Sequence, residues 1–224
     1  MTTANKITLT RIAMIPFFLY FASQSMYIFD KDTTAHTMIP TFVFPTATVV
    51  ALVLFCVASF TDFLDGYVAR KYNQVTDFGK FVDPLADKLL VSSALILFAE
   101  QGAMAGWMVC VILARELIIT SLRVVAANKG RVLAATWTGK VKTCVQIGGI
   151  IVIYLYYIAF PSIGLGDPMW LMPPQYIQQL PESIQMFSVV SVVGWVITLV
   201  TIYSGWDYLR KNWDIIKDGA VKQK

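Results

Sequence analysis

Residues 62–87 read DFLDGYVARKYNQVTDFGKFVDPLAD and lie between two predominantly apolar segments. Four of their five aspartates, Asp62, Asp65, Asp83 and Asp87, fall at helical spacing in two pairs. Ionised carboxylates at the edge of a bilayer are costly and need a compensating partner, and four of them together repel one another. Carboxylate oxygens are the ligands that Mg²⁺, Ca²⁺ and Mn²⁺ prefer in proteins. The stretch therefore predicts a site for one divalent cation or two.

The spacing of the aspartates predicts that they share a site. Residues three and four apart lie on one face of an α-helix, so Asp62 and Asp65 lie together on one helix, and Asp83 and Asp87 lie together on the next. The residues 70–80 between the two pairs are mainly polar or small. We expect this connection to fold the two helices back as an antiparallel pair.

Small residues border the aspartates on the same helices. Gly66 and Ala69 follow the first pair, and Gly79 precedes the second. A bulky ligand can approach the backbone closely where the side chains are small. The alternative is four solvated carboxylates on a loop, but the apolar segments on both sides are not typical of a solvated loop.

The composition is typical of an integral membrane protein. Of the 224 residues, 57% are hydrophobic and only 14% are charged, and the mean hydropathy is +0.63. Soluble domains carry about 25% charged residues. An apolar run must be about 20 residues long to cross a bilayer. Runs of this kind can be read at residues 9–28, 43–64, 82–101, 104–127, 141–160 and 184–207.

We therefore expect an all-α fold in which residues 1–224 form a single polytopic membrane domain with six transmembrane helices. The segment before the first run contains Lys6 and leads to Arg11. We interpret it as a short amphipathic N-terminal segment that feeds the first span. The third and fourth runs are separated only by residues 101–103, and this spacing predicts a tight hairpin.

Lysine and arginine residues mark alternate ends of the six runs. All but two of the 18 lie before or at the start of the first run, after the sixth, or around the connections from second to third and from fourth to fifth. The exceptions are Lys31, on the opposite side, and Arg115, inside the fourth run. By the positive-inside rule, both termini and the aspartates are expected at the cytoplasmic face. The net charge of +4 is interpreted as attraction to anionic membrane lipids and not to nucleic acid.

A carboxylate is the expected general base at that face. The chain has one histidine, His36, and it lies on the side opposite the aspartates. A Ser-His-Asp or Cys-His site is therefore excluded on the cytoplasmic side. Asp87 is our candidate, because it lies one helical turn beyond Asp83 at the edge of the set and faces the same cavity.

The string from Asp62 to Asp87 resembles, position for position, the signature of the CDP-alcohol phosphotransferases. Three further features are most similar to the bacterial phosphatidylglycerophosphate synthases within that family. They are the start NKITLTR at residues 5–11, the run DPLADKLL at residues 83–90, and Ala114-Arg115-Glu116 followed by Arg123. The resemblance extends from Asn5 to about Tyr208, and the segments 30–41 and 161–182 carry none of it.

The resemblance implies a reaction. The substrates would be CDP-diacylglycerol and sn-glycerol 3-phosphate, and the products phosphatidylglycerophosphate and CMP, formed at the bacterial cell membrane. Asp62, Asp65, Asp83 and Asp87 match the family's ligands for Mg²⁺ or Mn²⁺, with two ions expected. Asp87 also matches the family's proton acceptor.

The resemblance also implies a binding site for the CDP moiety of the liponucleotide. The matching positions are Asn5, Thr8, Gly66, Ala69, Arg70, Thr76 and Gly79.

A second polar set lies in the fourth and fifth runs. Arg115 and Glu116 fall inside the fourth run, Arg123 lies two turns beyond Arg115, and Lys140 begins the fifth run. Arginine forks suit a phosphate dianion. We interpret Arg115, Arg123 and Lys140 as the pocket for the phosphate of glycerol 3-phosphate. The alternative is that Arg115 and Glu116 simply neutralise neighbouring charges.

Two other functions remain open at this point. A family member could use another acceptor, such as inositol phosphate, serine or phosphatidylglycerol, because the aspartate motif does not separate these. A cation-coupled or proton-coupled transporter would also carry carboxylates within a membrane. It would be expected to show an acidic set on the external side and an internal repeat, and the sequence has neither. A homodimer is compatible with the sequence.

Overall fold

The computed structural model of the chain describes residues 3–27, 46–71, 77–131, 133–134, 136–159, 189–214 and 217. Side chains are described for these residues except 3–7, 25–27, 62–84, 87 and 128. The regular structure within these ranges is helical. The long helices are α1 (Thr3–Tyr27), α2 (Thr46–Lys71), α3 (Asp77–Glu100), α4 (Gly106–Asn128), α5 (Trp137–Ala159) and α8 (Val189–Lys211).

The all-α prediction is confirmed, and each of the six long helices overlaps one predicted apolar run. The expected N-terminal amphipathic segment is not a separate element, because α1 runs without a break from Thr3 to Tyr27. Thr8 and Arg11 in this part of α1 are each only 1% exposed. They pack inside the helical assembly.

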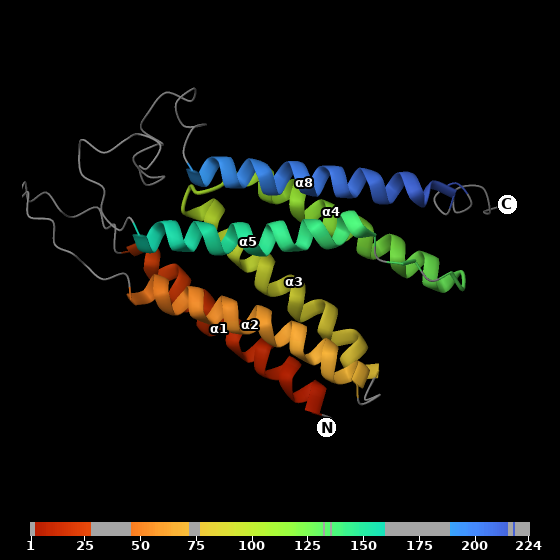
Figure 1. The fold of residues 1–224 in the computed structure, drawn as a ribbon, viewed down its shortest axis with the longest axis horizontal. Coiled ribbons are helices and arrows are strands. Elements are labelled where there is room, and N and C mark those ends of the chain that lie inside the picture. The colour runs from red at the N-terminus through yellow and green to blue at the C-terminus, as the bar shows by residue number, and fades with distance from the viewer. Residues whose placement is uncertain are drawn as a thin grey trace, which may run out of the picture.

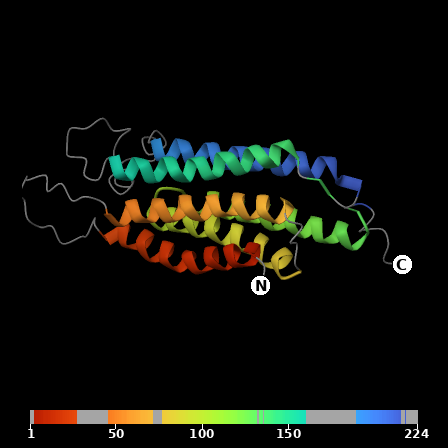
Figure 2. The same ribbon diagram turned by 60° about the horizontal axis from the view of Figure 1, so that its bottom comes forward.

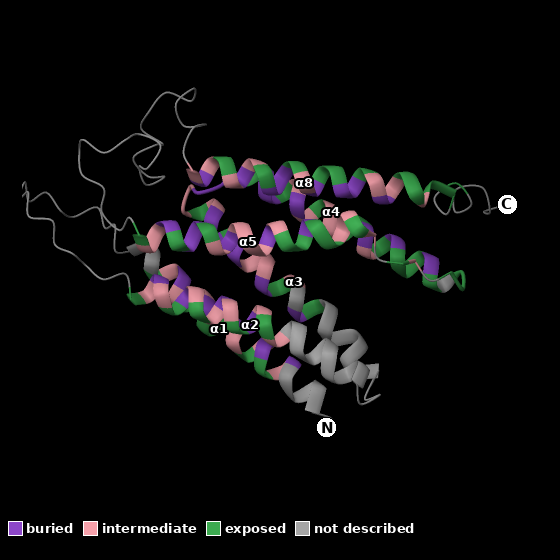
Figure 3. Cartoon of the chain, viewed as in Figure 1, coloured by how far each residue is buried: buried purple, intermediate pink, exposed green. Residues whose placement is uncertain are grey.

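Two of the described helices, α5 and α8, are long and apolar enough to cross a membrane by length and composition. The apolar part of α2, residues 46–61, is shorter. Crossing of the membrane by all six helices stays a prediction. Apolar side chains nevertheless cover the outer face of α8, where Val192, Leu199 and Trp206 are 49%, 56% and 68% exposed. Figure 3 shows exposed positions along the outer sides of the helices and buried positions where helices meet.

The helices form two packed groups. α1 packs against α2 and α3, while α8 packs against both α5 and α4, and α2 and α3 contact α5 between the groups. Figure 2 shows α5 and α8 above α1, α2 and α3. The start of α1, the end of α2, the start of α3, the end of α4, the start of α5 and the end of α8 all lie toward one end of the molecule (Figure 1).

A Schellman turn ends α3 and produces the predicted hairpin with α4. Gly102 adopts a positive φ of 72°, which costs glycine little because it has no Cβ. The Ala103 amide donates to the Phe98 carbonyl at 2.8 Å, and the Gly102 amide donates to the Ala99 carbonyl at 3.2 Å. The side-chain amide of Gln101 donates to the Ala22 carbonyl at 3.2 Å and ties this turn to α1.

An aromatic cluster joins four helices near the centre of the core. Phe18 of α1, Phe55 of α2, Phe98 of α3 and Tyr154 of α5 are each 0% exposed. Ring centroids lie 5.9 Å apart for Phe18 and Phe55, 6.3 Å for Phe18 and Tyr154, and 5.1 Å for Phe98 and Tyr154. Such pairs each contribute about 0.5–1.5 kcal/mol beyond the burial of their area. The cluster fixes α5 against the group that carries the aspartates.

Gly149 allows α5 and α8 to approach each other closely. A Cβ at this position would lie 2.5 Å from Ile197 Cδ1 and 3.1 Å from Val193 Cγ1 of α8. A Cβ at the neighbouring Gly148 would meet nothing within 4 Å. The two glycines therefore differ only in what an added methyl group would contact.

We predict that Gly149→Ala lowers the midpoint of thermal unfolding in detergent relative to Gly148→Ala. Both changes gain the same helix propensity, about 1 kcal/mol. Overpacking at Gly149 should cost about 1–3 kcal/mol more, because Ile197 and Val193 must shift. Equal midpoints for the two variants would show that the contact between α5 and α8 is not tight at this point.

Candidate functional site

The helix bounds bring the four aspartates to one end of the molecule. Asp62 and Asp65 lie in the C-terminal part of α2, and Asp83 and Asp87 lie in the N-terminal half of α3. These two helices run in opposite directions and meet at the same end (Figure 1). Their aspartate side chains lie outside the described set, and among the described side chains no group of three His, Cys, Asp or Glu could hold a metal ion. The metal site stays a prediction.

The positions predicted to bind CDP fall on α1, α2 and α3, and two of these helices carry the aspartates. Asn5 and Thr8 are in α1, Gly66, Ala69 and Arg70 are in α2, and Gly79 is in α3, while Thr76 lies outside the described residues. α1 packs against both α2 and α3, so these positions and the aspartates belong to one helical group.

Arg11 is a buried cation that was not among the predicted site residues. It lies three residues after Thr8 on α1, so the two share a helix face, and both are 1% exposed. A buried arginine keeps its charge and needs anionic or polar partners. Its spacing from Thr8 is the signal that could have added it to the candidate residues.

Glu116 of α4 is the centre of a charged network. Its Oε1 accepts a hydrogen bond from Arg115 Nη1 at 3.1 Å, and the same oxygen pairs with Lys142 Nζ of α5. The Lys142 side chain is 6% exposed, that of Arg115 13% and that of Glu116 22%. One carboxylate thus faces two cations in a region largely shielded from water, and the network keeps a positive excess.

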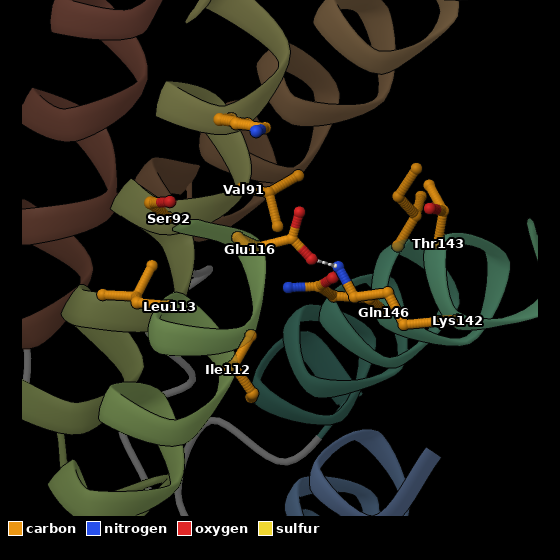
Figure 4. Close-up of a pocket in the computed structure, with 10 residues that line it drawn as sticks. Val91, Ser92, Ile112, Leu113, Glu116, Lys142, Thr143 and Gln146 are labelled. Carbon is orange, nitrogen blue, oxygen red and sulfur yellow. Dashed lines mark hydrogen bonds and ion pairs between the residues drawn. The ribbon is translucent and has the colours of Figure 1, made fainter. Parts of the chain in front are cut away.

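A small pocket opens beside this network, between α3, α4 and α5. Figure 4 shows Glu116 of α4 facing Lys142 of α5 across it. The Lys88 amine donates to Thr120 Oγ1, which in turn donates to the Glu116 carbonyl at 2.7 Å. The residues that line the pocket are Lys88, Val91, Ser92, Ile112, Leu113, Glu116, Lys142, Thr143, Gln146 and Ile147.

The pocket lies next to the aspartates along α3. Val91, which lines it, is one helical turn after Asp87, and Asp87 is one turn after Asp83. The helix face that carries these two aspartates therefore continues into the pocket wall. Two lysines and one glutamate give the pocket a net positive charge. Its position and charge suit a small anionic molecule that must reach the aspartates.

α8 holds both arginines of α4. Arg115 Nη2 donates to Ser204 Oγ at 2.7 Å, and a Cβ at Gly205 would lie 3.0 Å from Arg115 Cγ. Arg123 Nε donates to Tyr208 Oη at 3.1 Å, and its guanidinium carbon lies 5.5 Å from the centre of that ring.

The residues predicted to hold a phosphate, Arg115, Arg123 and Lys140, lie in different surroundings. Arg115 makes the ion pair with Glu116 that was the open alternative, and Arg123 contacts α8. Lys140 is exposed at the start of α5, and Lys142, about 200° further around the helix, reaches Glu116 instead. Their role in binding a phosphate stays a prediction.

Lys142 was not among the predicted site residues, although its spacing from Gln146 carried a signal. Lys142 and Gln146 are four residues apart in an otherwise apolar helix, and they are 5% and 3% exposed. Two buried polar residues on one face of an apolar helix indicate a polar partner or a ligand. Lys88 was counted among the basic residues near the aspartates, and its approach to Thr120 depends on how α3 and α4 cross.

Comparisons with known proteins show which proteins this chain is similar to. The family model described as CDP-alcohol phosphatidyltransferase matches residues 1–203. A Bacillus subtilis protein named CDP-diacylglycerol–glycerol-3-phosphate 3-phosphatidyltransferase is 39% identical over 218 residues, which are 95% of this chain and 96% of that protein.

Two enterobacterial proteins with the same name are also similar. One from Salmonella paratyphi A is 37% identical over 63% of this chain and 70% of its own length, and one from Yersinia pestis is 36% identical over 65% and 72%. The family match spans both helices that carry the aspartates and the α4 network. The chain belongs to the CDP-alcohol phosphatidyltransferase family.

Proposed function

We propose that this chain transfers the phosphatidyl group from CDP-diacylglycerol to sn-glycerol 3-phosphate, giving phosphatidylglycerophosphate and CMP in phospholipid biosynthesis. The observation that carries the proposal is the 39% identity to the Bacillus subtilis protein over 95% of this chain and 96% of that one. A match that covers both chains almost completely includes the acceptor side of the site as well as the aspartates.

Asp62, Asp65, Asp83 and Asp87 would hold Mg²⁺ or Mn²⁺, with two ions expected. The donor set fits, because it consists of carboxylates at one end of two antiparallel helices, and hard divalent cations prefer such oxygens. When bound, such ions would supply positive charge that stabilises the negative charge developing on the pyrophosphate.

The residues of the chain bind and orient the substrates and accept a proton. Asn5, Thr8, Gly66, Ala69, Arg70, Thr76 and Gly79 hold the CDP moiety. Asp87 accepts the proton from the attacking glycerol hydroxyl. The hydroxyl oxygen forms a bond to the β-phosphorus, the bond from that phosphorus to the oxygen shared with CMP breaks, and CMP leaves with the electron pair.

The acceptor would enter the pocket between α3, α4 and α5. Lys142 and Lys88 line it and suit the phosphate of glycerol 3-phosphate, while Arg115 acts through Glu116. Arg123, near the end of α4, and Lys140, at the start of α5, lie toward the end of the molecule from which this anion would arrive. Their charges would attract the phosphate toward the pocket.

The positive excess of this pocket favours a phosphorylated acceptor over serine, which carries no phosphate to balance it. Inositol phosphate and phosphatidylglycerol both carry a phosphate group, so charge does not exclude them. Membership of the family leaves the transporter alternative without support.

The chain is further proposed to cross the bacterial cell membrane six times, with both termini and the aspartates at the cytoplasmic face. Three observations support this topology. Successive helices run in alternating directions (Figure 1), most lysines and arginines of the described helices lie toward one end of the molecule, and apolar residues cover the outer face of α8. Anionic lipids of the inner leaflet would surround the basic end.

The purified chain should release CMP from CDP-diacylglycerol only when sn-glycerol 3-phosphate and Mg²⁺ or Mn²⁺ are both present. Excess EDTA should abolish the release, because the carboxylates would lose the cations that compensate them. Undiminished release in EDTA would contradict the metal proposal.

In the same assay, Asp87→Asn should stop turnover while CDP-diacylglycerol still binds, since the amide cannot accept the proton.

Lys142→Met and Lys140→Met form a matched pair, because the two lysines are neighbours on α5 with opposite exposure. Losing the buried charge-assisted contact should cost about 2–4 kcal/mol. We therefore expect Lys142→Met to raise the KM for glycerol 3-phosphate strongly and the KM for CDP-diacylglycerol little. Lys140→Met should have a smaller effect on the same constant. A larger effect of Lys140→Met would place the phosphate at the exposed lysine.

Cysteine labelling tests the orientation. In a background without Cys56, Cys110 and Cys144, Arg131→Cys should react with an impermeant thiol reagent only in inverted vesicles. Ala105→Cys should react only in spheroplasts. Both positions are exposed and lie at opposite ends of α4. Labelling of both from the same face would contradict the proposed topology.

A further inference from the structure

One face of α8 near its C-terminal end contacts the polar residues of α4 and α5. The segment Ser204-Gly205-Trp206-Asp207-Tyr208 supplies these contacts, while Trp206 itself points outward at 68% exposure. Ser204 is 0% exposed and Tyr208 is 1% exposed. A buried polar strip in an apolar helix needs an explanation, because each polar group must find a partner there.

The hydroxyl groups one and two turns earlier on this face serve their own helix. Thr198 Oγ1 donates to the Gly194 carbonyl at 2.8 Å, and Thr201 Oγ1 donates to the Ile197 carbonyl at 2.7 Å. Ser204 differs, because its Oγ accepts the hydrogen bond from Arg115 Nη2 at 2.7 Å. The two threonine hydroxyls bond to their own helix, and the serine hydroxyl bonds to α4 at the level where Arg115 contacts α8.

Gly205 makes room for the stem of that arginine. A Cβ at this position would lie 3.0 Å from Arg115 Cγ and 4.0 Å from Arg115 Nε. Cγ is in the middle of the side chain, so it cannot move aside without moving the guanidinium. The missing side chain at Gly205 and the hydroxyl of Ser204 therefore fix together where the guanidinium of Arg115 lies.

The same segment also positions the start of α5. Asp207 Oδ2 accepts a hydrogen bond from Thr138 Oγ1 at 2.7 Å and pairs with Lys211 Nζ at 2.9 Å. Thr136 Oγ1 accepts the Gly139 amide at 3.2 Å, as an N-cap residue does. The first turn of α5, which precedes Lys142, is thus tied to α8.

Three charged side chains connect these contacts of α8 to the pocket. Arg115, seated on Gly205, contacts Glu116 Oε1, and the same oxygen pairs with Lys142, which lines the pocket. Moving the guanidinium of Arg115 would change how Glu116 is shared and where the Lys142 amine lies.

We infer that residues 204–208 of α8 position the acceptor-binding cations of α4 and α5, and that Gly205 is the critical residue because it seats Arg115. The inference rests on the proposed function, since it concerns the affinity for the phosphorylated acceptor. Gly205 is a positioning residue, because it acts through Arg115, Glu116 and Lys142 and touches no substrate.

Gly205→Ala tests the inference, with Gly148→Ala as the matched control whose Cβ would meet nothing within 4 Å. The KM for glycerol 3-phosphate should rise roughly fivefold or more in Gly205→Ala, as overpacking in a tight site predicts. The KM for CDP-diacylglycerol and the turnover at saturating acceptor should change less than about twofold, because the aspartates lie on other helices. Gly148→Ala should match the parent in all three constants.

A double-mutant cycle separates positioning from a general loss of packing. In an Arg115→Ala background the clashing Cγ is absent, so adding Gly205→Ala should have no further effect on the acceptor KM. If Arg115→Ala does not fold, Ser204→Ala replaces it as a second test, and it should raise the acceptor KM alone. Equal rises in both KM values, or constants equal to those of Gly148→Ala, would overturn the inference. A parent chain that releases no CMP with glycerol 3-phosphate would instead overturn the proposed function.

Discussion

A carboxylate inside an apolar helix, Glu116, is the constraint around which the described part of the site is arranged. Such a charge must be compensated where it lies, and Glu116 receives Arg115 from its own helix and Lys142 from α5. Because the two cations outnumber the carboxylate, the network keeps a positive excess. The pocket beside it can therefore attract an anion without leaving the empty state strongly charged.

The need to compensate Glu116 also explains why α4, α5 and α8 pack together around it. α8 supplies Ser204 to Arg115 and Tyr208 to Arg123, so both arginines of α4 are held against α8. The aromatic cluster of Phe18, Phe98 and Tyr154 fixes α5 against α1 and α3. The helices that carry the aspartates and the helices that carry the cations are in this way held at a fixed distance.

Much of the fold could be predicted from the sequence, because hydrophobic runs of span length define helices locally. The hairpin between α3 and α4 and the pairing of Arg115 with Glu116 were both within reach, since they involve neighbouring residues. Contacts between helices were not, because periodicity identifies a helix face but not the helix that covers it. Lys142 and the Ser204–Tyr208 segment were missed for this reason. Arg11 was placed at the start of the first apolar run and given no role, although it is buried where α1 packs against its neighbours.

The identity of the product lipid tests the central claim most directly. The purified chain would be given CDP-diacylglycerol, Mg²⁺ and equal concentrations of sn-glycerol 3-phosphate, inositol phosphate and serine, and the lipid products would be identified by mass spectrometry. Phosphatidylglycerol would be added to a second sample as a competing lipid acceptor. The account predicts phosphatidylglycerophosphate as the product in both samples. A different phospholipid as the main product would contradict it, even if CMP were released.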